Sequence, residues 1–195
     1  MFEPLMDEET VHVAIASSEV VHCLKTYGEV AIDDLTAQYI TEKTLDLLLV
    51  GSVSETQIRK IRPWCESSCC DVVFVDSLSK DDKVVNNVMR NIAKKLTVRQ
   101  MPNNIDISDI RKISNQSSHV LAFNSYQELY HFLDTQKLHN LNGLIYLAHG
   151  GDLSNYEANN RHLGDFISPQ TYFISSFLSG GLGECTVIVS ITYSD

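Results

Sequence analysis

The five cysteines are the most reactive side chains of this 195-residue chain, and three of them lie close together. Cys65, Cys69 and Cys70 fall within the run WCESSCC, whereas Cys23 and Cys185 are isolated in the sequence. Thiolates in such a run could hold a soft metal ion, but a structural zinc site also needs a second ligand pair at a defined spacing. The sequence has no such pair and no histidine near the run. We therefore expect reduced thiols and no metal site, and we assign no role to the cluster.

The histidines are the next candidates for metal binding or catalysis. The seven histidines are scattered and never take the HExxH spacing of zinc proteases. His149 opens an HGG run after an apolar stretch, as in the oxyanion loop of some esterases, but the chain has no GxSxG nucleophile motif. A catalytic thiol would need an activating neighbour. A small cysteine-dependent enzyme that uses Cys23 or the 65–70 cluster stays as an alternative.

The glycines are placed so that phosphate chemistry is difficult. Of nine glycines, only Gly28 and Gly51 precede residue 143. The P-loop and the GxGxxG turn both need closely spaced glycines, because backbone N–H groups must approach the phosphate. The first 142 residues can form neither loop.

The apolar pattern predicts alternating strands and helices. Residues 11–16, 45–52 and 70–77 are continuous apolar runs, which is typical of strands covered on both faces of a parallel sheet. Residues 55–64 predict a helix ended by Pro63. Residues 79–96 predict a long buried helix, with Ser79 and Asp82 as a capping box, an apolar stripe, and lysines at its end that favour the helix dipole. Further predicted elements are helices over 103–116, 125–138 and 153–166 and strands over 142–149, 171–179 and 184–193.

The segment NIDISDIR at 104–111 follows this long helix and carries Asn104, Asp106, Asp109 and Arg111. By itself the pattern is explained by Asn104 or Asp106 capping a helix with an acidic first turn. Its place in the chain favours a second interpretation. It resembles the catalytic T7 loop of the tubulin superfamily, most closely that of FtsZ, in which N-x-D-x-x-D follows a long central helix. The order of elements over residues 70–193 is similar to that family as well.

The resemblance implies a loop whose carboxylates reach the GTP of the next subunit in a filament and help to orient the attacking water. The chain departs from the family where FtsZ and tubulin hold GTP. The glycine-rich loops of the family are replaced here by AIASSEVVHCL and VGSVSETQIRK. Without backbone approach to the phosphates, we expect GTP binding to be lost and no cofactor to be bound.

The predicted fold is therefore α/β, a shortened tubulin/FtsZ-like fold with a parallel-sheet N-terminal half, a central helix and a mixed-sheet C-terminal half. We divide it into a truncated nucleotide-domain remnant at 1–77, the central helix and connector at 78–103, and an FtsZ C-terminal-like domain at 104–195.

The predicted function is that of an FtsZ-like pseudo-GTPase without catalytic residues. It would act by protein–protein contact on an FtsZ or tubulin-type filament, as a regulator of cell division or of the cytoskeleton. The interface would be formed by Asn104, Asp106, Asp109 and Arg111, with the two carboxylates exposed. The partner would be FtsZ, a related filament protein or a second copy of the chain. A nucleotide-independent self-assembling scaffold is the alternative.

Composition excludes several other classes. The chain is 44% hydrophobic and 21% charged, which is ordinary for a globular protein. Its 15 Lys and Arg against 25 Asp and Glu give a net charge of -10, opposite to that of a nucleic-acid-binding surface. No apolar run reaches the length of a membrane span. The acidic start MFEPLMDEET does not resemble a targeting peptide, so we expect a cytoplasmic protein.

Overall fold

The computed structural model describes residues 10–19, 27–98, 104–115, 120–135, 141–150 and 152–192. The N-terminal part contains β1 (Val13–Ser17), β2 (Gly28–Ala31), η1 (Ile32–Asp34), α1 (Ala37–Glu42), β3 (Leu47–Gly51), α2 (Glu55–Ser67) and β4 (Asp71–Asp76). Two helices follow, α3 (Asp82–Thr97) and α4 (Ile107–Ser114). The C-terminal part contains β5 (Val120–Phe123), α5 (Tyr126–Thr135), β6 (Leu141–His149), α6 (Leu153–Gly164), β7 (Tyr172–Leu178) and β8 (Cys185–Ile191).

The strands form one eight-stranded sheet in the order β2-β1-β3-β4-β5-β8-β6-β7. All neighbours from β2 to β5 are parallel, as are β6 and β7. β8 lies antiparallel between β5 and β6. The predicted α/β fold, with a parallel N-terminal half, a central helix and a mixed C-terminal half, is confirmed.

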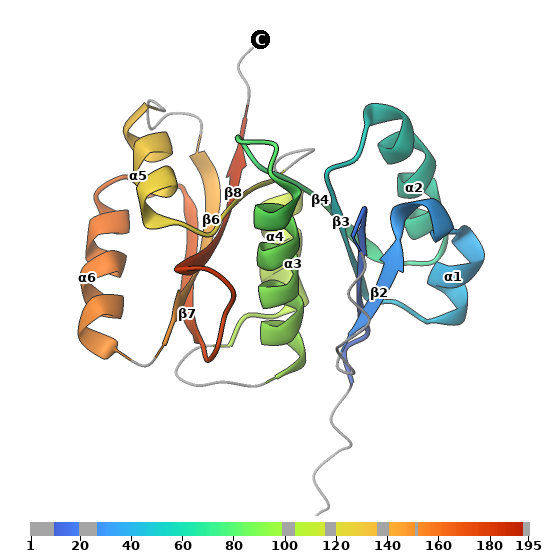
Figure 1. The fold of residues 1–195 in the computed structure, drawn as a ribbon, viewed down its shortest axis with the longest axis horizontal. Coiled ribbons are helices and arrows are strands. Elements are labelled where there is room, and N and C mark those ends of the chain that lie inside the picture. Colours follow the sequence, from blue (N-terminus) through green and yellow to red (C-terminus); the bar gives the residue numbers. More distant parts are fainter. Residues whose placement is uncertain are drawn as a thin grey trace, which may run out of the picture.

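Helices cover both faces of this sheet. α3 and α4 pack on one face, where they share a core with strands of both halves of the sheet. On the other face, α1 and α2 cover the N-terminal strands, and α5 and α6 cover the C-terminal strands. Figure 1 shows α3 and α4 between these two pairs.

The two halves of the sheet meet at a narrow junction. β4 and β5 are joined by only two register pairs, Val75 with Val120 and Asp76 with Leu121. By contrast, five pairs join β3 to β4 and seven join β6 to β7. The expected boundaries at residues 77 and 103 flank α3, which crosses this junction. The division into separate units stays a prediction.

α3 is the buried helix that the apolar stripe predicts. Val88 is fully buried at its centre, and the helix packs against strands of both halves. Its N-cap is Asp81, which accepts a hydrogen bond from the Lys83 N–H, so the predicted Ser79–Asp82 capping box is wrong. The two predicted lysines, Lys94 and Lys95, do lie in the last turn of the helix, and Lys95 is almost fully buried there.

Several elements differ from the sequence expectation. Pro63 lies inside α2, four residues before the helix ends, and does not terminate it. The strands β2 and β5 and the helix α1 were not predicted. The sequence also predicts a helix after β1, with Val20, Val21 and Leu24 on one face, and these residues lie outside the part that the structure describes. Within the described part of the chain, no helix has the length and apolar character needed to cross a membrane.

Candidate functional site

The T7-like residues lie at the start of α4, and Asp106 is the helix N-cap. Its carboxylate accepts a hydrogen bond from the Asp109 N–H at 3.1 Å, while the Asp109 carboxylate accepts one from the Asp106 N–H at 2.9 Å. The two aspartates therefore form a reciprocal capping box. The Ser108 hydroxyl also donates to Asp106 at 2.6 Å, and this bond is the main cause that lowers the pKa of the Asp106 carboxyl.

Asp109 is not the exposed carboxylate that the sequence led us to expect. It is 8% exposed, because α4 packs its apolar face, with Ile110 and Ile113, into the core. Its Oδ1 accepts a hydrogen bond from the hydroxyl of Tyr172, at the start of β7, at 2.5 Å. Partial burial, this bond and the nearby carboxylates raise the pKa of Tyr172 to about 12. Asp109 therefore joins α4 to the edge strand of the sheet.

The other two T7-like residues differ in their surroundings. Arg111 forms a two-pronged ion pair with Asp71, the first residue of β4: its Nε donates to Oδ1 at 3.0 Å and its Nη2 donates to Oδ2 at 2.5 Å. Asn104 is exposed ahead of α4. The structure thus places the four residues on one short segment, where Asn104, Asp106 and Arg111 are exposed and Arg111 is held by Asp71. Because Asp71 and Tyr172 begin parallel strands, this segment lies at the amino edge of the sheet.

The opposite, carboxyl edge is where an α/β sheet commonly binds phosphates. After β1, the Ser18 hydroxyl donates to the Asp82 carboxylate at 3.1 Å. After β3, Ser54 caps α2 through a box with Gln57, and Asp81 caps α3. At each helix N-terminus, one free N–H group is therefore bonded by a side chain of the chain itself, at Gln57 and at Lys83. The carboxylates of Asp81 and Asp82 would repel a phosphate there.

Gly51, at the end of β3, is required by packing. A Cβ atom built on it would lie 2.6 Å from the terminal methyl of Met89 and 2.8 Å from Val85 on α3. This glycine lets α3 approach the sheet closely, and phosphate binding is not needed to explain it.

The cysteine cluster is mostly buried. Cys65 in α2 and Cys70 before β4 are 0% and 5% exposed, and the Cys70 N–H donates to the Cys65 carbonyl at 3.0 Å. A separate hydrogen bond between the Cys65 and Cys70 thiols, together with burial, raises the pKa of the Cys70 thiol. Cys69 is exposed, and Cys23 lies outside the described residues. In the part of the chain that the structure describes, no three His, Cys, Asp or Glu side chains are grouped to hold a metal.

A buried polar chain at the end of β6 was missed from the sequence. His149 Nε2 lies 2.8 Å from the Thr186 hydroxyl, and His149 Nδ1 lies 2.8 Å from the Gly183 carbonyl. Asn91 of α3 donates to the same Thr186 oxygen at 2.7 Å and exchanges hydrogen bonds with the backbone of Leu182. The HGG run marked His149 in the sequence. Nothing there indicated that Asn91, far away in an apolar helix, would share its partner.

These hydrogen bonds fix one form of the ring. Because Thr186 accepts from Asn91, its own hydrogen is available to His149 Nε2, and His149 Nδ1–H donates to the carbonyl. Burial lowers the pKa of His149, and the neighbouring charge of Lys94 acts in the same direction. Thr186 is fully buried, so it is not an accessible nucleophile. The chain of bonds holds the loop between β7 and β8 against α3.

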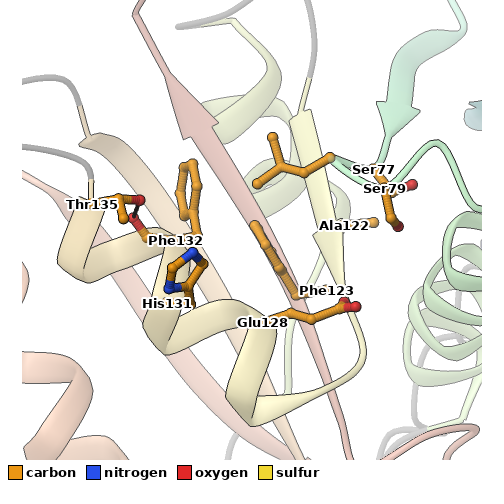
Figure 2. A pocket seen from close by; sticks show the side chains of 9 residues that line it. Ser77, Ser79, Ala122, Phe123, Glu128, His131, Phe132 and Thr135 are labelled. Carbon is orange, nitrogen blue, oxygen red and sulfur yellow. Dashed lines mark hydrogen bonds between the residues drawn. The ribbon is translucent and has the colours of Figure 1, made fainter.

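A cavity of about 350 Å³ lies at the carboxyl ends of β4 and β5. Figure 2 shows Phe123 and Phe132 forming its apolar part, with Glu128 and His131 of α5 at its rim. Leu78, which is 56% exposed, lines it from the loop before α3. The cavity has the size and the mixed lining of a small-ligand or side-chain pocket.

The comparisons with known proteins show a distant likeness among solved structures. No family model matches the chain, and no curated protein matches it. Among solved structures, it is similar to CetZ from Methanosaeta thermophila strain DSM 6194, a tubulin/FtsZ-family protein, with a TM-score of 0.41 and 10% identity. The alignment covers 81% of this chain and 56% of the CetZ chain, so this chain spans little more than half the length of CetZ. The likeness concerns the course of the backbone alone.

Proposed function

We propose that the chain acts by protein–protein contact, through the exposed surface of Asn104 and Asp106 at the start of α4. The partner that the T7-like motif implies is a subunit of an FtsZ or tubulin-type filament. In this proposal the chain is a pseudo-GTPase, which docks on such a filament without carrying the nucleotide for the next contact. Asp109 and the Arg111–Asp71 ion pair hold the segment in place, and Asn104 and Asp106 make the contact.

The observation that carries the proposal is the separation of two dissimilar ends along α3. Its 16 residues span about 24 Å at 1.5 Å per residue. Its first residue, Asp82, bonds to Ser18 at the carboxyl edge of the sheet, and the connector that follows its last turn leads to α4 at the amino edge. A subunit with different surfaces at its two ends suits a head-to-tail contact.

The carboxyl edge supports the second part of the proposal. Where a filament subunit would hold nucleotide, this chain has two self-capped helix N-termini and the carboxylates of Asp81 and Asp82. Such an edge does not favour a bound triphosphate. A docked copy would therefore offer no nucleotide to the next subunit.

Polymerisation of the cognate FtsZ, followed by light scattering and phosphate release, tests the contact. The parent chain is expected to change both readouts, and Asn104→Ala combined with Asp106→Asn is expected to abolish the change. Asparagine caps a helix about as well as aspartate, so the double variant should fold normally. The matched control is Asp152→Asn, which makes the same change at the exposed N-cap of α6. A parent chain without effect, or a double variant as active as the parent, would refute the contact.

Titration with a fluorescent GTP analogue tests the loss of nucleotide binding separately. We expect no saturable binding at micromolar concentrations. A dissociation constant near 1 µM, about -8 kcal/mol, would contradict the pseudo-GTPase interpretation while leaving the docking surface untouched.

A further inference from the structure

β7 is the last strand of the sheet, and its sequence lacks the features that usually prevent an edge strand from pairing with another chain. In the described part of the chain, β6 is its one partner in the sheet. The pairing runs over all seven residues without a register shift. Natural edge strands are usually shortened, bulged, or marked with charge or proline, because an open edge recruits further strands. β7 (YFISSFL) has none of these features.

The side chains of β7 are apolar on both faces and incompletely buried. Phe173 and Phe177 lie on the face of α5 and α6, where they pack at the border of that core. Tyr172 and Ile174 lie at the border of the core under α3 and α4. All four retain intermediate exposure. A further strand alongside β7 would cover the apolar groups that remain open to solvent on both faces.

The distribution of charge indicates which strand could pair with the open side of β7. The chain carries a net charge of -10, so two copies repel each other overall. Between Asp165 and Glu184, however, there is no Asp, Glu, Lys, Arg or His, and β7 lies in the middle of this neutral segment. Two copies that pair along β7 therefore bring together no charged side chains of the strands themselves.

We infer that β7 pairs antiparallel with β7 of a second copy, about a two-fold axis at Ser175, to give one continuous sheet across a dimer. Residues opposite each other in such a pair share a face of the sheet. Among registers that obey this rule, the one centred on Ser175 aligns all seven residues of both strands. It also places Phe173 opposite Phe177 and Tyr172 opposite Leu178, so apolar side chains meet apolar side chains.

The dimer would extend the proposed function. β7 begins at Tyr172, whose hydroxyl bonds to Asp109 of α4, so the dimer edge and the proposed docking segment are mechanically joined. A dimer would present two docking segments. Pairing of two copies along β7 needs neither a filament nor nucleotide, so its test is independent of the test of the docking proposal.

Cysteine cross-linking tests the register directly. In a background with Cys23→Ser and Cys69→Ser, Ser175→Cys places two thiols opposite each other, with Cα atoms about 5 Å apart. Phe173→Cys is the matched control, because its two thiols would lie four residues apart along the strand, about 13–14 Å, beyond the reach of a disulfide. We expect a reducible dimer for Ser175→Cys and none for Phe173→Cys under mild oxidation.

Sedimentation equilibrium of the full chain tests association without a cross-link. The parent is expected to show twice the mass of one chain at high concentration. Ile174→Lys should weaken dimerisation by about tenfold or more, because it places charge at the edge, whereas Leu153→Lys, at an exposed position of α6, should not. Circular dichroism establishes that each variant is folded. A parent that stays monomeric, or equal cross-linking of the two cysteine variants, would overturn the inference.

Discussion

Replacement of Asp109 by alanine should destabilise the fold markedly, although the residue belongs to a motif that would place it in a solvent-exposed loop. The carboxylate accepts hydrogen bonds from the Tyr172 hydroxyl and from the Asp106 N–H. Alanine removes both bonds and opens space beneath α4, where Asp109 is 8% exposed. Hydrogen bonds to a charged group contribute about 1.5–3 kcal/mol each.

The expected loss is smaller than the sum of two such bonds, because water can reach the Asp106 N–H and part of the Tyr172 side chain. We expect the free energy of unfolding to fall by about 2–4 kcal/mol. For a chain of this length, that corresponds to a drop in Tm of about 5–15 °C. The same substitution at Asp134, an exposed residue of α5, should change stability by no more than about 0.5 kcal/mol.

Urea unfolding monitored by circular dichroism provides the measurement, and a double-mutant cycle with Tyr172→Phe isolates the bond between α4 and β7. We expect a coupling energy of about 1–2 kcal/mol between Asp109 and Tyr172. If Asp109→Ala unfolds at the same urea concentration as the parent, the capping box and the bond to β7 do not hold α4, and the segment is an open loop as the motif alone suggests.

Two further predictions concern α3 and the loop that it holds. Val88→Asp places a carboxylate at a fully buried position and should lower the free energy of unfolding by about 3–5 kcal/mol. Lys94→Ala, which removes hydrogen bonds to the exposed Ser179–Gly180 backbone, should cost under about 1 kcal/mol; the reverse ranking in urea unfolding would mean that α3 presents another face. Because burial lowers the pKa of His149 in the fold, the unfolded chain binds the extra proton more readily, so stability should fall as the pH drops below about 6.5. His149→Gln should lose this part of the pH dependence, and an unchanged profile between about pH 7.5 and about pH 5.5 would contradict the buried neutral ring.

The strands that could be predicted are those with a strong local signal. The apolar runs at β3 and β4 are covered on both faces of the sheet, so their residues alone are enough to predict strands there. β2 (GEVA) is short and half-exposed, so its residues carry no such pattern; it is a strand because β1 lies beside it. β5 has only four residues and is fixed by pairing with β4 and β8.

Helix ends and the candidate site show a similar limit. Pro63 was expected to end a helix, yet α2 continues past it to Ser67. The T7-like motif correctly marked the start of a helix, because caps are local in sequence. The burial of Asp109 was not predictable, since its partner Tyr172 lies 63 residues further along the chain. The link between Asn91 and His149 through Thr186 is likewise a product of the fold.

The narrow junction between β4 and β5 affects how the protein unfolds when force is applied to it. Two register pairs connect the sheet there, so the backbone ladder resists separation less at this seam than anywhere else along the sheet. Resistance must come from α3, whose apolar side chains pack on strands from both sides. When a force pulls the N-terminal and C-terminal halves apart, the sheet should separate first between β4 and β5. The packing of α3 on both halves opposes that separation. Amide hydrogens of β4 and β5 at the seam should then exchange with solvent sooner than those of β3 or β6, as expected where two cooperative folding units meet.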